Sequence, residues 1–295
     1  MLNLNTFNQI NDDNHYDILG RVRTMGVNHK DLENYKIVYN SKTKKNYSIV
    51  NDTYTPINNI DVFGDVIGKL SKLGLDPKLS IYQYKNGAST AIRAKIPQKS
   101  RIIQQGDNPN NTTKLMPEFW LYNSYDTTQK ARLSLSVFDN ICSNGMAFKN
   151  WLNFYNVKHS PNGINKVGVD PDKLLEGLDM VGRQFDLIQD WAKKVITYDT
   201  AQSLLKSLSG MNTKSTDPNK KRDRINNYDR ILEQVQTEER TRGGLTLWAL
   251  VSGVTQYSTL RATKGGLNTN SLKVGVDRQE AVANWLSRVI EPAYS

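Results

Sequence analysis

The stretch LSIYQYKNGASTAIRAKIP, residues 79–97, predicts the antiparallel hairpin from which the fold of this chain can be built. Its Asn86-Gly87 pair, placed between alternating residues, is a strong signal for a two-residue β-turn. The turn implies four cross-strand pairs: Lys85 with Ala88, Tyr84 with Ser89, Tyr82 with Ala91, and Ser80 with Arg93. Because successive side chains of a strand point to opposite faces, the hairpin has two faces of different composition.

One predicted face is apolar and the other alternates tyrosines with cations. The apolar face holds Leu79, Ile81, Ile92, Ala94 and Ile96. The other face holds Lys78, Tyr82, Tyr84, Arg93 and Lys95. Aromatic rings that stack on bases, beside cations that contact phosphates, are what single-stranded nucleic-acid binding needs. The alternative is an ordinary solvated face, because tyrosine favours strands and Lys and Arg favour surfaces.

A second hairpin is predicted from EFWLYNSYD, residues 118–126, and KARLSLSVFDN, residues 130–140. A four-residue loop over 126–129 places Tyr125, Lys130, Asn123 and Arg132 on one face. The same register places Trp120, Tyr122, Leu133, Leu135 and Val137 on the other. A slip of one residue would exchange the two faces. Tyr125, Lys130 and Arg132 therefore join the candidate nucleic-acid-binding residues.

The remaining chain predicts an α+β fold, with an antiparallel sheet packed by helices and a helical C-terminal region. Asn58 or Asn59 is expected to cap a helix over 60–74, and Asp170-Pro171 begins a helix with an apolar stripe that extends to Val195. Further helices are expected over 199–209, 245–260 and 278–290, and 211–224 is read as a polar segment with a basic end. Three regions follow: an N-terminal arm over 1–35, a sheet domain over 36–160 and a helical region over 161–295.

Charge favours a polyanionic partner. The chain carries a formal net charge of +10, and residues 78–158 contain eleven Lys and Arg against four acids. No apolar stretch is long enough to span a bilayer, and the first residues lack the features of a secretory signal, so we expect a cytoplasmic protein with no membrane partner.

Catalytic and metal-binding patterns are missing from the sequence. No P-loop, GxSxG, HExxH or kinase signature occurs. The single cysteine, Cys142, excludes an internal disulfide and a multi-cysteine zinc site. His15, His29 and His159 are far apart, and the acids Asp107, Asp126 and Asp139 are isolated. We expect a protein that is not an enzyme and has no metal and no cofactor.

FWLYNSYDTTQKARLSLSVFDNICSNGMAF, residues 119–148, resembles a core signature of domain-of-unknown-function family 932, which phages and plasmids encode. The matching positions are Asn123-Ser124, Asp126 and Cys142-Ser143-Asn144 here, Val50, Tyr54, Ile57 and Asn58 upstream, and Trp248, Thr255 and Tyr257 downstream. The resemblance spans residues 45–260 and implies a mobile-element origin, but it brings no catalytic residues. The SYD sequence replaces a commoner histidine-bearing turn.

The order of elements is also similar to the β-β-β-α core of ring-forming single-strand annealing proteins. We therefore expect a phage-encoded, oligomeric, non-catalytic protein that binds single-stranded DNA and promotes annealing in replication or recombination. The alternative is a phage accessory protein that binds a host or anti-phage defence protein, with the same Tyr and Arg residues as interface anchors.

Overall fold

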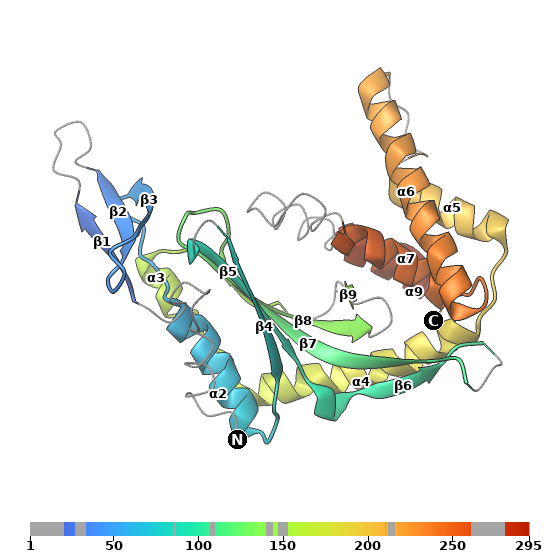
Figure 1. The fold of residues 1–295 in the computed structure, drawn as a ribbon, viewed down its shortest axis with the longest axis horizontal. Helices are drawn as coiled ribbons and strands as arrows, with labels where there is room; N and C mark the ends of the chain where they lie inside the picture. Colours follow the sequence, from blue (N-terminus) through green and yellow to red (C-terminus); the bar gives the residue numbers. More distant parts are fainter. Residues whose placement is uncertain are drawn as a thin grey trace.

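The computed structural model describes residues 21–26, 34–84, 87–106, 110–139, 144–146, 153–209, 211, 216–260 and 281–294. These residues form a seven-stranded and a three-stranded antiparallel sheet together with helices, and the C-terminal part is helical (Figure 1). The predicted α+β class is confirmed.

The seven-stranded main sheet has a central path in the order β10-β8-β7-β5-β4, while β6 pairs with β7 and β9 pairs with β8. Its strands are β4 (Lys78–Tyr84), β5 (Ser89–Lys95), β6 (Arg101–Gln104), β7 (Thr112–Ser124), β8 (Ala131–Asp139), β9 (Asn144–Met146) and β10 (Asn153–Val157). The first hairpin has the predicted register, because Tyr84 pairs with Ser89 and Ser80 with Arg93. The strong Asn-Gly turn signal thus predicted this pairing correctly.

Two helices cover one face of the main sheet. A π-helical turn, Ile60–Gly64, continues into α2 (Asp65–Lys72), and the long helix α4 (Pro171–Lys193) runs along the same side (Figure 1). The core joins the buried stripes of both helices to the apolar side chains of the strands, including Ile92, Ala94 and Ile96. The predicted apolar face of the hairpin is therefore the core face.

The predicted helix starts and ends are confirmed in part. Asp170 caps α4 as expected, since its side chain accepts a hydrogen bond from the Asp172 N–H. The stripe ends earlier than predicted, because Val195 lies beyond the helix and is 78% exposed. Asn59 occupies the N-cap position of the π-helical turn, as predicted, but its side chain makes no capping hydrogen bond. The Asn58 carboxamide instead accepts a hydrogen bond from the Val22 N–H at 2.7 Å, which ties the helix entry to another strand.

The three-stranded small sheet has the order β1 (Val22–Gly26), β2 (Tyr35–Asn40) and β3 (Asn46–Asn51). Strand β1 lies within the stretch interpreted as an N-terminal arm, so that stretch includes ordered sheet. One face of the small sheet packs Val22, Val38 and Val50 against Tyr54 and Tyr125. The small sheet therefore sits at the end of the main sheet where the β7–β8 loop lies.

The C-terminal helices pack beside the far end of the main sheet (Figure 1). They are α5 (Tyr198–Ser209), α6 (Pro218–Arg242), α7 (Leu247–Leu260), a helical segment over 281–290 and α9 (Glu291–Tyr294), while a short helix α3 (Pro161–Ile164) precedes α4. The basic run after residue 219, read from the sequence as a polar segment, belongs to α6, which Asp217 caps through the Asn219 N–H.

Candidate nucleic-acid interface

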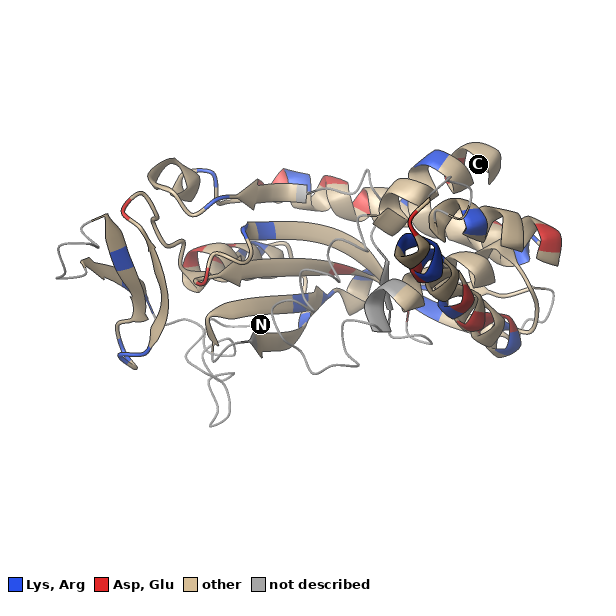
Figure 2. Cartoon of the chain, turned by 90° about the horizontal axis from the view of Figure 1, so that it is seen from above, with Lys and Arg blue, Asp and Glu red and all other residues tan. Residues whose placement is uncertain are grey.

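The face of the main sheet opposite α2 and α4, called the outer face here, is built from aligned cross-strand rows. Directly paired residues share a face, so the registers of β4, β5, β7 and β8 define the rows. The rows contain Tyr82, Ala91, Tyr122 and Arg132; Ser80, Arg93, Trp120 and Ser134; and Lys78, Lys95, Glu118 and Ser136. Seen from above, the strands lie between the small sheet and the C-terminal helices (Figure 2).

Three aromatic rings form a continuous stack on the outer face. The Tyr82 and Trp120 ring centroids are 6.0 Å apart, and the planes are 20° from parallel. The Trp120 and Tyr122 centroids are 5.7 Å apart at 6°. Tyr82 and Trp120 are half-buried, whereas Tyr122 is only 4% exposed. The small side chain of Ala91 lies between the two tyrosines of its row and leaves room for this stack.

A buried carboxylate organises the cations beside the rings. Glu118, which is fully buried, accepts hydrogen bonds from Trp120 Nε1 at 2.8 Å and from Ser136 Oγ at 2.9 Å. Its other oxygen pairs with Arg93 Nε. The Arg93 guanidinium also lies 5.1 Å from the centre of the Trp120 ring. Arg93, predicted to contact phosphate, is thus a buried residue that carries its own counter-charge.

Lys95 is the half-buried cation next to this pair. Its ammonium lies 3.6 Å from the centre of the Phe138 ring. Burial lowers the pKa of Lys95 below its usual value, and the nearby Arg93 charge lowers it further. A bound anion would oppose both effects, because it favours the charged form of the ammonium.

The other predicted residues lie in different surroundings. Lys130 is exposed in the loop, and Arg132 is half-buried on the outer face. Tyr125 is 2% exposed, and its hydroxyl accepts a hydrogen bond from the Asn59 N–H at 2.9 Å. Tyr125 therefore packs in the interior and offers no ring to a base. The side chain of Tyr84 lies outside the described part of the chain.

The predicted register of the second hairpin is wrong by one residue. Tyr122 pairs with Arg132, not with Leu133, so the connecting loop is one residue longer than expected. The slip exchanges the faces: Trp120 and Tyr122 join the outer face, and Asn123 points into the interior. Ser124 stabilises the longer loop, because its hydroxyl donates to the Gln129 carbonyl and accepts from the Gln129 N–H. Trp120 and Tyr122, the residues missed by the sequence reasoning, could have been found by testing this slip.

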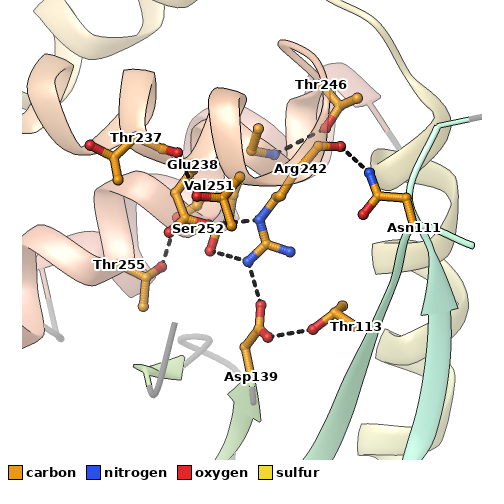
Figure 3. A network of polar contacts seen from close by, with 12 residues as sticks. Asn111, Thr113, Asp139, Thr237, Glu238, Arg242, Thr246, Val251, Ser252 and Thr255 are labelled. Carbon is orange, nitrogen blue, oxygen red and sulfur yellow. Dashed lines mark hydrogen bonds and ion pairs between the residues drawn. The ribbon is translucent and has the colours of Figure 1, made fainter. Parts of the chain in front are cut away.

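Two buried polar junctions flank the outer face. At the far end, Arg242 of α6 pairs with Asp139 of β8 at 2.5 Å and with Glu238 at 2.7 Å, and it donates to Ser252 Oγ of α7 (Figure 3). Thr113 of β7 donates to the second Asp139 oxygen at 2.6 Å. This network, the ionic junction, ties two strands to two helices.

The second junction, at the small sheet, contains no ion pair among the contacts described. Asn123 donates from its amide nitrogen to the Ile57 carbonyl and to Asn59 Oδ1, both at 2.8 Å. His159 accepts a hydrogen bond from the Ile57 N–H and stacks on Tyr54. Burial lowers the pKa of His159 to about 4, so the ring is neutral at neutral pH. Several motif residues of the resemblance, including Asn58 and Asn123, thus serve this neutral junction.

Within the described residues, no group of three or more His, Cys, Asp or Glu side chains is placed to hold a metal ion. Over the same part of the chain, no helix is long and apolar enough to cross a membrane. Cys142 and Asp107 lie outside the described residues.

No curated protein and no solved structure shows significant similarity to the chain. A family model described as "Domain of unknown function (DUF932)" matches residues 46–282, which is most of the chain and includes the main sheet, both junctions and the helices α5, α6 and α7. The chain therefore belongs to this family of unknown function.

Proposed function

We propose that the outer face of the main sheet binds single-stranded nucleic acid, with a base stacking on Tyr82, the half-buried end of the ring stack. The observation that carries the proposal is the continuous stack of Tyr82, Trp120 and Tyr122 on one sheet face. Ring stacking contributes about 1–3 kcal/mol per base and is tolerant of sequence. The half-buried rings are held in place by their neighbours, so little side-chain freedom is lost on binding.

Cations on both sides of the rings supply contacts for the phosphate backbone. Lys78 and Lys95 occupy one row of the outer face, and Arg132 occupies another, with exposed Lys130 in the adjoining loop. Each phosphate that such a residue neutralises releases condensed counterions, so the affinity falls as the salt concentration rises. Arg93 has a different role in this proposal, because its pairing with Glu118 fixes the edge of Trp120.

In this proposal the protein is non-catalytic, is encoded by a phage or plasmid, and acts in the cytoplasm. It holds single-stranded DNA with bases displayed, which would favour annealing of complementary strands in replication or recombination. Self-association would align several outer faces and extend one binding path, so that affinity grows through multivalency.

Titration of a fluorescent single-stranded oligonucleotide, followed by anisotropy at several salt concentrations, tests the proposal. We expect Trp120→Ala to weaken binding by about tenfold, because Tyr82 loses the ring that holds it in the stack. Tyr35→Ala is the matched control, because Tyr35 is 44% exposed on the small sheet and should leave affinity unchanged. Lys95→Gln should reduce the salt dependence, whereas Lys173→Gln on α4, on the core side of the sheet, should not.

Glu118→Gln distinguishes a site that binds through its rings from a surface that binds nucleic acid through charge alone. Gln removes the charge that pairs with Arg93 and weakens the acceptor that holds Trp120 Nε1, so the ring is less well fixed and oligonucleotide affinity should fall a few-fold, whereas a surface that binds by charge alone would bind more tightly. Circular dichroism checks that the variant is folded. Unchanged affinity in Trp120→Ala, or no binding even at low salt, would overturn the proposal in favour of a protein-binding surface. Cleavage of the oligonucleotide on addition of Mg²⁺ would show a nuclease instead.

A further inference from the structure

The outward face of the small sheet presents an apolar row to solvent. Met25, Ile37 and Ile49 are paired in register across β1, β2 and β3. Met25 is 45% exposed and Ile49 is 62% exposed, while Ile37 between them is half-buried. Tyr35 and Tyr39 lie on the same face of β2, on either side of Ile37. We call these five residues the small-sheet patch.

The small-sheet patch has the composition of a protein interface. Tyr, Met and Arg are enriched at such interfaces, and exposed apolar patches rimmed by polar residues mark interaction sites. Its opposite face is already used, since Val22, Val38 and Val50 pack on Tyr54 and Tyr125. The small-sheet patch is therefore not needed for the core of the small sheet, which forms on the opposite face.

Among the described residues around the patch, charge is almost entirely of one sign. Residues 21–26 and 34–52 contain one acid, Asp52, and the six cations Arg21, Arg23, Lys36, Lys42, Lys44 and Lys45. Arg23 pairs directly with Tyr39 at the edge of the patch, and the β2–β3 turn at that end carries Lys42 and Lys44, both exposed. Electrostatic complementarity therefore selects an acidic partner.

A nucleic acid fits the small-sheet patch poorly. Tyr35 and Tyr39 are four residues apart on one strand, about 13 Å at the usual rise, and the aliphatic row separates them. The rings therefore do not form a platform like that of Trp120 and Tyr82. A second copy of the chain would bring the same cations together, which like-charge repulsion opposes.

We propose that the small-sheet patch docks an acidic polypeptide segment of another protein. The apolar side chains of that segment would pack on Met25, Ile37 and Ile49, and its carboxylates would contact the cations at the edge of the patch. The apolar row gives affinity by removing exposed surface from water. The cations Arg23, Lys42 and Lys44 give the preference for acidic partners. This docking does not depend on nucleic-acid binding by the outer face.

Anisotropy of a labelled peptide of alternating Glu and Val, titrated with the full chain, tests the docking. We expect binding that Ile49→Lys weakens at least tenfold and that Lys42→Gln with Lys44→Gln weakens several-fold. Ile102→Lys is the matched control, since Ile102 is 67% exposed on β6, away from the patch, and should not alter binding. A peptide of alternating Lys and Val should bind far more weakly.

Four results would overturn the proposal: no binding of the acidic peptide, equal binding of the basic one, no effect of Ile49→Lys, or loss of oligonucleotide binding in Ile49→Lys. Sedimentation velocity adds a fifth. Self-association of the wild type that Ile49→Lys abolishes would assign the patch to a second copy. Circular dichroism establishes that each variant is folded, and Trp120→Ala should bind the acidic peptide normally even if the nucleic-acid proposal fails.

Discussion

The main sheet is held to its two neighbours by junctions of opposite chemistry. The ionic junction fastens it to α6 and α7 through Arg242, Asp139 and Glu238, all nearly fully buried. The neutral junction fastens it to the small sheet through amide and imidazole groups, including Asn123 and His159. Both join the elements through hydrogen bonds between buried polar groups, but only the ionic junction places full charges in the interior.

This difference predicts which change, a substitution or a drop in pH, disrupts each junction. A buried ion pair fails when one partner is removed, because the other charge remains unpaired in a low dielectric. A neutral junction fails when a proton adds a charge to it. Loss of the ionic junction should therefore affect the whole molecule, whereas loss of the neutral junction should first release the small sheet.

The largest effect is expected at the ionic junction. Arg242→Ala leaves Asp139 and Glu238 buried without their guanidinium and should lower the free energy of unfolding by about 3–5 kcal/mol. Arg240→Ala, two residues away and exposed, is the control and should change it by less than about 0.5 kcal/mol. Urea unfolding monitored by circular dichroism measures both. Equal stabilities would show that the junction contributes nothing.

Acid should act on the neutral junction. The pKa of His159 is about 4 in the folded protein and 6.5 in the unfolded chain, so the unfolded chain binds the extra proton between these values. Stability should be complete above pH 6.5 and fall by about 3 kcal/mol as the pH drops to 4. His159→Gln should flatten this part of the profile, as measured by unfolding at several pH values. A profile identical to that of the wild type would contradict the assignment.

The packing of α6 against α7 can be tested without changing any charge of the ionic junction. A Cβ at Gly253 of α7 would lie 2.6 Å from the Val235 Cα of α6, so Gly253→Ala should cost about 1–3 kcal/mol by forcing the helices apart. Gly182→Ala in α4 is the control, because nothing lies within 4 Å of the position that its Cβ would take. It should stabilise by about 0.5–1 kcal/mol. Thermal unfolding compares the two, and a shift of the same sign in both would refute the close crossing.

The smallest effect is expected from Asn58→Ala, which removes the acceptor of the Val22 N–H. We expect a loss of about 1 kcal/mol, confined to the small sheet. Hydrogen exchange should show faster exchange of β1 amides with unchanged protection in β7. Asn51→Ala, at an exposed position, should leave both unchanged. Uniform acceleration across both sheets would mean that the junction is not local.

The sequence was most informative where local chemistry decides the structure. The Asn86-Gly87 turn predicted the register of the first hairpin, and Asp170-Pro171 predicted the start of α4. The β7–β8 loop carries no comparable signal: it contains no glycine, and Thr127 takes a positive φ of 63° that few residues favour. The register, and with it the placement of Trp120, therefore depends on Ser124 and on tertiary packing.

Helix α6 shows a second limit. Its buried positions are Ile231, Val235, Glu238 and Arg242, so half of its inward stripe is charged. A hydrophobic periodicity cannot reveal such a stripe, because Glu238 and Arg242 are compatible with burial as an ion pair that Asp139 on a distant strand completes. Neither helix α6 nor the ionic junction could therefore be predicted from hydrophobic periodicity.

The family match begins at Asn46, the first residue of β3, and so leaves β1 and β2 outside it. A fragment that began there would keep β3 but lose the strands that cover Val50 and Tyr125, leaving an unpaired strand edge beside apolar surface. Such an edge is a template for aggregation. A soluble fragment of this protein therefore needs to start before Val22, even though the shared family sequence starts later.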